Sequence, residues 1–310
     1  MEERMNSFVL TLTGREISSK ALAQVAGIAG LHGLGVERIE TLSGDERPSG
    51  YACRVIYAQG EISDLAALRE ALRVVSDEMG VDVAVQRADE FGRVRRLFVF
   101  DMDSTLIQGE TIDELAKMAG VGEQVVTITA SAMRGEIQFQ ESFRRRVGLL
   151  KGLPESRVLE VIDRLPLMEG TERLFRTLKA RGARTAIFSG GFTFFGAVLK
   201  EKLGVDYVFA NQLDVQDGSV TGEVLGQIVD GARKAELLVE IAGREGIPQE
   251  QVVAVGDGAN DLPMLALAGM GVAFHAKPIV RAKAEFCVTH VGLDGLLYLL
   301  GIPDWEWAEI

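Results

Sequence analysis

Short apolar runs that alternate with helix-like stretches over residues 95–290 constrain the fold of this chain more than any other feature. The first run, LFVF at 97–100, is followed by a long, mostly helical stretch to about Lys179. After it come the runs TAIF, VDYVFA, VVAV, MGVAF and FCVTH. Parallel strands are buried on both faces and need long crossover connections, so this pattern predicts an α/β domain with a parallel sheet and helices on both faces. The two alternating runs around Asp217-Gly218 predict a hairpin.

The first part of the chain follows a different pattern. Over residues 7–88, strand-like and helix-like segments occur in the order βαββαβ, which is typical of a ferredoxin-like α+β sandwich. The stretch ADEFGRV is then a short polar joint. We therefore expect one domain over residues 1–90 and a second over residues 91–310.

Composition and charge limit the partners and the compartment. With 310 residues, 47% hydrophobic, the chain can bury the cores of two modest domains, and its formal net charge of −12 argues against nucleic-acid binding. No apolar run is long enough to span a bilayer, and the first residues lack the apolar core of a signal peptide. Cys53 and Cys287 are far apart in sequence and are expected to be reduced, so we expect a cytoplasmic protein without membrane contact.

Four polar clusters lie where predicted strands end or predicted helices begin. Each is common by itself, for example as a capping carboxylate, a turn or a solvated lysine. Ligands of open α/β sheets bind at the carboxyl ends of strands, so the joint occurrence predicts a single site. The clusters are Asp101-Met102-Asp103-Ser104-Thr105, Ser189-Gly190-Gly191, Lys234, and Gly256-Asp257-Gly258-Ala259-Asn260-Asp261.

The order of these motifs resembles that of the haloacid-dehalogenase-like phosphohydrolases, over about residues 94–300. Asp-x-Asp-Ser-Thr followed by a nearby Glu is similar to the branch of that family that hydrolyses phosphoserine. The resemblance implies a Rossmann-like parallel sheet with a helical cap. It also implies Mg²⁺-dependent hydrolysis of O-phospho-L-serine to L-serine and phosphate through an aspartyl-phosphate, the last step of serine biosynthesis.

The resemblance assigns chemical roles to the carboxylates. Asp101 would be the nucleophile, and Asp103 would protonate the leaving oxygen and then deprotonate the attacking water. Mg²⁺ prefers hard oxygen ligands, which Asp101, the backbone carbonyl of Asp103, and Asp257 would supply. Asp261 would support the metal shell or hold Lys234.

The remaining motif residues would bind the phosphate. Ser189 and the backbone N–H of Gly190 would hold phosphate oxygens, since glycine permits close approach of the backbone. Lys234 would supply positive charge to the transferring group. Asn260 would hydrogen-bond the metal shell or the substrate.

The helical stretch at about 107–179 resembles the cap of this family, which excludes water and recognises the leaving group. Glu110 would pair with the ammonium of the substrate and Arg146 with its carboxylate, while Met133 and Phe139 would form an apolar wall. Taken alone, Arg146 ends a basic run, Glu110 begins a helix, and the two apolar residues suit a core. Only their match to the family's spacing favours a binding role.

The front segment resembles an ACT-type regulatory domain. That resemblance implies L-serine as an effector and a homodimer, and a plain oligomerisation module is the rival interpretation. Three other functions stay open. They are phosphoryl transfer to a small alcohol such as homoserine, hydrolysis of other small phosphomonoesters, and serine sensing without catalysis. The intact Asp101, Asp103, Lys234 and Asp257 argue against the last.

Overall fold

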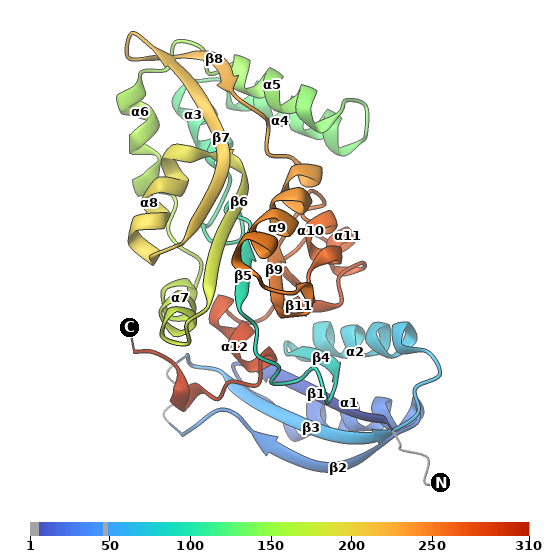
Figure 1. The fold of residues 1–310 in the computed structure, drawn as a ribbon. Helices are drawn as coiled ribbons and strands as arrows, with labels where there is room; N and C mark the ends of the chain where they lie inside the picture. The colour runs from blue at the N-terminus through green and yellow to red at the C-terminus, as the bar shows by residue number, and fades with distance from the viewer. Residues whose placement is uncertain (1–5, 46–48, 310) are drawn as a thin grey trace.

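The N-terminal part of the chain is a four-stranded antiparallel sheet with two helices on one face (Figure 1). The protein is described by a computed structural model, which covers residues 6–45 and 49–309. The sheet order β2-β3-β1-β4 and the element order confirm the predicted ferredoxin-like arrangement. Its elements are β1 (Asn6–Gly14), α1 (Ser19–Leu31), β2 (Leu34–Thr41), β3 (Ala52–Gly60), α2 (Leu65–Met79) and β4 (Asp82–Arg87).

Strand alternation divides the side chains of this sheet between two cores. Phe8, Leu10 and Leu12 of β1 pack with residues of α1 and α2, as period-2 patterning requires. Val9, which points to the other face, belongs to the core of the second domain, together with Tyr51. The face of the sheet that α1 and α2 leave open is therefore buried against the rest of the chain.

The second sheet has seven strands in the order β11-β10-β9-β5-β6-β7-β8. All neighbours pair in parallel except β7 and β8, which form the hairpin predicted at Asp217-Gly218. This confirms the predicted α/β class. The strands are β5 (Leu97–Phe100), β6 (Arg184–Phe192), β7 (Tyr207–Gln216), β8 (Ser219–Leu225), β9 (Val252–Gly256), β10 (Met270–Phe274) and β11 (Phe286–Val288).

Helices cover both faces of this sheet because successive side chains along each buried strand point to opposite faces. Leu97 and Val99 point to a core shared with α9 and α10, whereas Phe98 and Phe100 point to one shared with α7 and α8. Each core is closed by the apolar stripe of an amphipathic helix. The covering helices are α7 (Thr171–Ala180), α8 (Thr193–Leu203), α9 (Gly231–Glu245), α10 (Leu262–Leu267), α11 (Pro278–Arg281) and α12 (Leu296–Leu299).

Between β5 and α7 the chain forms a helical lobe that stands above the carboxyl ends of the strands (Figure 1). The β7–β8 hairpin reaches up to it, since Gly152 N donates to Val220 O at 2.8 Å. The last helix of the predicted insertion, α7, packs instead on the sheet, where the Phe175 ring lies 4.9 Å from that of Phe100. The lobe contains α3 (Thr111–Met118), α4 (Gly122–Met133), α5 (Phe139–Gly148) and α6 (Glu155–Glu160). None of the described helices combines the length and the apolar character needed to cross a membrane.

Backbone and side-chain hydrogen bonds join the N-terminal sheet to the end of the chain. The Asp82 carboxylate accepts from Thr289 N at 2.7 Å and His290 N at 2.9 Å. Tyr51 Oη accepts from Gly292 N at 2.9 Å. The C-terminal segment also packs here, since Asp304 Oδ1 accepts from Gly44 N at 2.7 Å and Asp304 N donates to Leu42 O at 3.0 Å.

The Asp82 carboxylate gives this junction a pH dependence. Burial raises the pKa of Asp82 to about 7, against the backbone N–H donors of His290, Thr289 and Val291, which lower it. A carboxyl group whose pKa is raised on folding stabilises the fold fully below its unfolded pKa, and that contribution is lost as pH rises towards 7. We therefore expect the unfolding free energy of wild type to fall relative to that of Asp82→Asn between pH 4 and pH 7. Chemical denaturation at several pH values measures the difference, and a pH-independent difference would contradict the prediction.

Candidate active site

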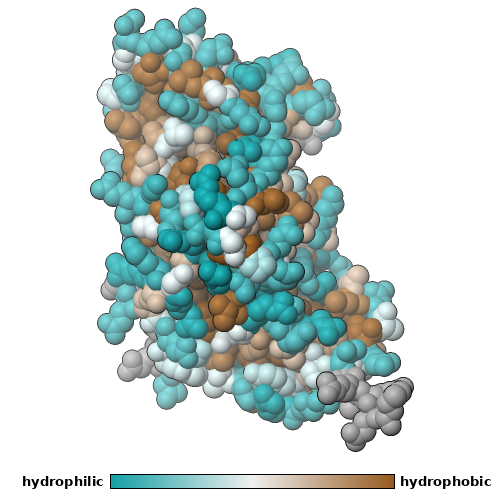
Figure 2. Space-filling view, viewed as in Figure 1, coloured by the Kyte–Doolittle hydropathy of each residue, from teal (hydrophilic) through white to brown (hydrophobic). Residues whose placement is uncertain are grey.

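Three of the four predicted polar clusters line one cavity of about 780 Å³ at the carboxyl ends of β5, β6 and β9, below the helical lobe, and the fourth, Lys234, is buried beside it against Asp101. In the space-filling view, a notch separates the lobe that carries α4 and α5 from the part that carries α10 and α11 (Figure 2). Residues from the sheet, the lobe and the loop before α11 all line the cavity. The site is therefore open to solvent between the two parts.

A buried lysine and three carboxylates form the floor of the site. Lys234 Nζ lies 2.8 Å from Asp101 Oδ1 and 2.7 Å from Asp261 Oδ1, and its side chain is fully buried. Burial lowers the pKa of Lys234, but the charges of Asp101 and Asp261 more than reverse this, so the ammonium stays protonated. Asp230 caps α9 by accepting from Arg233 N, which places Lys234 in the first turn.

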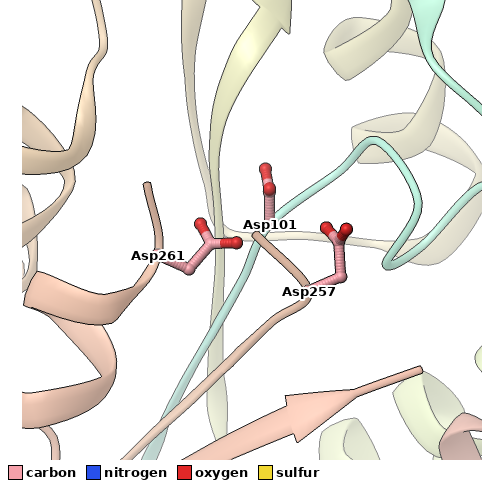
Figure 3. A group of neighbouring side chains, drawn as sticks. All are labelled: Asp101, Asp257 and Asp261. Atoms are coloured by element: carbon pink, nitrogen blue, oxygen red, sulfur yellow. The ribbon is translucent and has the colours of Figure 1, made fainter. Parts of the chain in front are cut away.

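The third carboxylate, Asp257, lies beside Asp101 (Figure 3). One oxygen of each of Asp101, Asp257 and Asp261 lies within 4.8 Å of the others. Asp261 is already engaged, since it accepts from Gly258 N at 3.0 Å as well as from Lys234. Burial raises the pKa of Asp257 to about 7, and the charge of Asp261 adds to the effect.

This donor set fits a divalent cation. Burial, followed by the charge of Asp261, also raises the pKa of Asp101 well above its ordinary value. One lysine faces three buried carboxylates here, so its single positive charge does not balance theirs. Carboxylate oxygens are the ligands that hard cations prefer. Because both oxygens of Asp261 already accept hydrogen bonds, Asp101 and Asp257 are the carboxylates of this cluster that could bind a cation.

Asp103 occupies a different environment from Asp101. Its Oδ1 accepts from Thr111 N at 2.7 Å, at the start of α3, and its Oδ2 accepts from Ser189 Oγ at 3.3 Å. Burial raises the pKa of Asp103 to about 7, with the charge of Glu110 contributing next. A carboxyl group with this pKa can both donate and accept a proton near neutrality.

The chain turns sharply after Asp103, whereas Ser189 lies inside β6 (Arg184–Phe192), where the pairing with β7 is irregular. Ser104 has a left-handed φ of 58°, and its Oγ donates to Glu110 at 3.0 Å. Ser189 Oγ accepts from Gly191 N at 2.8 Å. A Cβ on Gly191 would lie 2.3 Å from Asp103 Oδ2, so only glycine fits there. Gly190 lines the cavity, and its carbonyl accepts from Asn211 at 2.8 Å.

The lobe contributes three of the four predicted recognition residues to the cavity. Glu110, Phe139 and Arg146 all line it. The Nε of Arg146 is buried and has no hydrogen-bond partner among the described residues, and burial lowers the pKa of the guanidinium. The side chain of Met133 lies outside the described residues, although its helix α4 contributes Thr129 and Ala132 to the lining.

Two residues at the site had no role in the sequence prediction. Lys277 lines the cavity, and its charge lowers the pKa of Asp257 against the effect of burial. It follows β10 by three residues, so the same search of strand ends could have found it. Thr105, quoted only as part of the first motif, donates to Asp257 Oδ1 at 3.5 Å. Asn260, which was predicted, lines the cavity near Asp257.

The site is a cluster of carboxylates with one lysine at the carboxyl edge of an open α/β sheet. This arrangement is typical of enzymes that bind an anionic substrate through a divalent cation. The model of the haloacid dehalogenase-like hydrolase family matches residues 95–269. The chain belongs to this family.

Three known proteins are similar to this chain. The phosphoserine phosphatase SerB2 of Mycobacterium tuberculosis is 43% identical over 302 residues, which are 97% of this chain and 73% of that protein. The crystal structure of a probable phosphoserine phosphatase from Vibrio cholerae has a TM-score of 0.76 at 36% identity, and covers 96% of this chain and 88% of that one. The phospho-aspartyl intermediate analogue of a phosphoserine phosphatase has a TM-score of 0.63 at 48% identity, over 66% of this chain and 99% of that one.

Proposed function

We propose that the chain hydrolyses O-phospho-L-serine to L-serine and phosphate. Its relatives over nearly the whole chain are phosphoserine phosphatases. The observation that carries the substrate is that Arg146, whose buried Nε has no partner among the described residues, and Glu110 line the same cavity as Asp101 and Asp103. A guanidinium and a carboxylate on one wall suit a leaving group with both a carboxylate and an ammonium. Phosphate release from a panel of phosphorylated amino acids and sugars tests the assignment.

The side chains at the floor of the site carry out the phosphoryl transfer. Asp101 attacks phosphorus, so that an Oδ–P bond forms while the P–O bond to the serine oxygen breaks. Asp103 gives its proton to the departing oxygen, then takes one from the water that cleaves the aspartyl-phosphate. Lys234 supplies positive charge to the transferring group, while Ser189 and the N–H of Gly190 hold its oxygens. A phospho-aspartyl analogue of a similar phosphatase supports the intermediate.

The cation is Mg²⁺ in this proposal. Asp101, Asp257 and the carbonyl of Asp103 would hold it, Asp261 would position Lys234, and Asn260 would hydrogen-bond the metal shell or the substrate. When bound, the ion neutralises negative charge on the phosphoryl group.

Asp257→Asn should raise the Mg²⁺ concentration needed for half-maximal activity by about tenfold or more, because one charged oxygen ligand is lost. Titrating activity with Mg²⁺ measures the shift. Asp113→Asn is the matched control, since Asp113 lines the same cavity without belonging to the carboxylate cluster. The same Mg²⁺ dependence for wild type and Asp257→Asn would show that Asp257 is not a ligand of the cation.

Arg146→Ala should raise KM for phosphoserine by about 100-fold, because a bidentate, charge-assisted contact with the carboxylate is lost. Hydrolysis of p-nitrophenyl phosphate, which has no carboxylate, should change by less than about threefold. Arg145→Ala is the control, since Arg145 lies on the outer side of α5 and pairs with Glu141. Equal losses on the two substrates would exclude Arg146 as the carboxylate contact.

The remaining lobe residues complete the pocket in this proposal. Glu110 binds the ammonium, and Phe139 with Met133 encloses the short carbon skeleton. The Phe139 ring stacks on Phe143 at 6.1 Å, which holds it against the cavity. The division into residues 1–90 and 91–310 is part of the same proposal, with the cap predicted at about 107–179 ending before α7, which packs on the sheet.

We also propose that the chain forms a homodimer through β2. This strand is at the end of its sheet, and Val36 and Ile39 on it are 41% and 48% exposed. An edge strand with unpaired backbone groups and apolar side chains is suited to pairing with a second copy. Sedimentation of the Val36→Lys, Ile39→Lys variant should give the monomer mass where wild type gives the dimer.

The N-terminal domain is proposed to bind L-serine as an effector, and the compartment is proposed to be cytoplasmic. Cys53 and Cys287, both free, suit a reducing compartment. Cell fractionation tests the compartment.

A further inference from the structure

One buried hydroxyl in the active-site cavity takes no part in the proposed phosphoryl transfer. Ser142 lies in α5 and lines the cavity, yet it is only 1% exposed. A serine or threonine inside a helix often donates to the carbonyl four residues before it. Thr129 on the neighbouring helix does so, with its Oγ1 at 3.0 Å from Val125 O. The Ser142 Oγ, by contrast, has no hydrogen-bond partner among the described residues.

The next turn of the same helix carries a second donor in the same condition. Arg146 follows Ser142 by four residues, so the two side chains lie on one face of α5. Both line the cavity, and the buried Nε of Arg146 also has no partner in the described part of the chain. Buried polar groups without partners are costly and rare in folded proteins. Two of them, one turn apart on a cavity wall, indicate a pair of donors that a bound molecule would satisfy.

The surroundings of this pair favour an anion with two acceptor atoms. Phe139 and Phe143, the other residues of α5 that line the cavity, supply only rings, which stack 6.1 Å apart. A carboxylate can accept from a guanidinium and a hydroxyl at once, one on each oxygen. The positive charge for the phosphoryl group is supplied at the floor by Lys234, which belongs to α9 and not to the lobe. The donors of α5 are therefore left for the other end of the substrate.

We propose that Ser142 is a second recognition residue for the carboxylate of the leaving group, with its hydroxyl donating to one oxygen while Arg146 contacts the other. This inference rests on the proposed function and deepens it, since it names a further residue that determines specificity. A site built to hydrogen-bond a substrate group rejects the analogue that lacks it, because buried polar groups of the site then stay unpaired. Ser142 thus adds to the discrimination against phosphorylated amines, which carry an ammonium but no carboxylate.

Ser142→Ala should lower kcat/KM for phosphoserine by about tenfold or more, because a hydrogen bond to a charged group is lost. The same loss is expected for 3-phosphooxypropanoate, which keeps the carboxylate and lacks the ammonium. O-Phosphoethanolamine, which keeps only the ammonium, should change by less than about twofold. Ser131→Ala on α4 is the matched control, since Ser131 is not among the lining residues and its Oγ accepts from Arg134 at 3.3 Å. Equal effects on the three substrates, or no effect on phosphoserine, would overturn the proposal.

Thermal unfolding separates a contact with substrate from a structural role. Ser142→Ala removes a buried hydroxyl that has no partner, so Tm without substrate should stay the same or rise. A fall in Tm of more than about 4 °C would show that the hydroxyl is bonded within the protein, against the proposal. On top of Arg146→Ala, Ser142→Ala should lower kcat/KM for phosphoserine by about threefold or more again. The absence of any further loss would mean that Ser142 acts only by holding Arg146.

A crystal structure of Asp101→Asn with phosphoserine shows the contact directly, and replaces the kinetic test should Ser142→Ala fail to fold. We expect Ser142 Oγ within about 3 Å of a carboxylate oxygen. A contact with the ammonium instead, or with no polar atom of the substrate, would contradict the proposal. Hydrolysis of phosphoserine by wild type with no change in Ser142→Ala would overturn the Ser142 contact alone. No hydrolysis by wild type would remove the proposed function, and this inference with it.

Discussion

Replacing Asp101 with asparagine should lower phosphoserine turnover by at least about 10⁴-fold while the protein stays folded. The neutral amide is a poor nucleophile, and it cannot form the acyl phosphate. The fold should survive because Asn has nearly the same shape and Lys234 keeps its contact with Asp261 at 2.7 Å. Phosphate release and thermal unfolding, measured on the same preparation, check both halves of the prediction.

Asp113→Asn is the control for this change, as it lies in the same cavity outside the carboxylate cluster. It should keep activity within about threefold of wild type. Turnover by Asp101→Asn within tenfold of wild type would exclude Asp101 as the nucleophile. A loss of activity together with a loss of folding would be resolved by Asp101→Glu, which keeps the charge and should fold but remain inactive.

Replacing Asp103 with asparagine should lower phosphoserine turnover by about 10²–10⁴-fold, the range of general acid–base catalysis. The leaving serine oxygen needs a proton, whereas p-nitrophenolate leaves without one. With p-nitrophenyl phosphate we therefore expect a rapid burst of p-nitrophenolate, about one per active site, followed by slow turnover. The burst arises because the phosphoenzyme then lacks the base that activates water.

The pH dependence of wild type belongs to the same prediction. Burial raises the pKa of Asp103 to about 7, and the first step needs its protonated form. For phosphoserine, kcat/KM should therefore fall as pH rises through that pKa, and Asp103→Asn should lose this limb. Stopped-flow absorbance and a pH series measure both effects. If Asp103→Asn lowers turnover of phosphoserine and of p-nitrophenyl phosphate equally and shows no burst, Asp103 is not the general acid and base.

Much of the fold could be predicted because its strands are continuous apolar runs. LFVF at 97–100 and VVAV at 252–255 are buried on both faces, so each appears in the sequence without alternation. The packing of the two domains could not be predicted in this way. It depends on pairs such as Tyr51 with Gly292, which are 241 residues apart. No local pattern marks such contacts.

The site was predictable where a residue follows a strand and less so where burial decides its role. Lys234 looks like a solvated helix residue in the sequence, and only the fold shows it fully buried between two carboxylates. The lobe is an intermediate case. Phe139, Ser142, Phe143 and Arg146 recur at helical spacing and line the cavity together, so periodicity separates Arg146 from the exposed Arg144 and Arg145.

The central claim is that the side chain of Asp101 captures the phosphoryl group. The most direct measurement is a crystal structure of the protein with Mg²⁺ and beryllium fluoride, which takes the place of a phosphoryl group on a carboxylate. We predict beryllium bonded to a side-chain oxygen of Asp101, within reach of Lys234 and Ser189. An adduct on Asp103, Asp257 or any other residue, with Asp101 unmodified, would contradict the account.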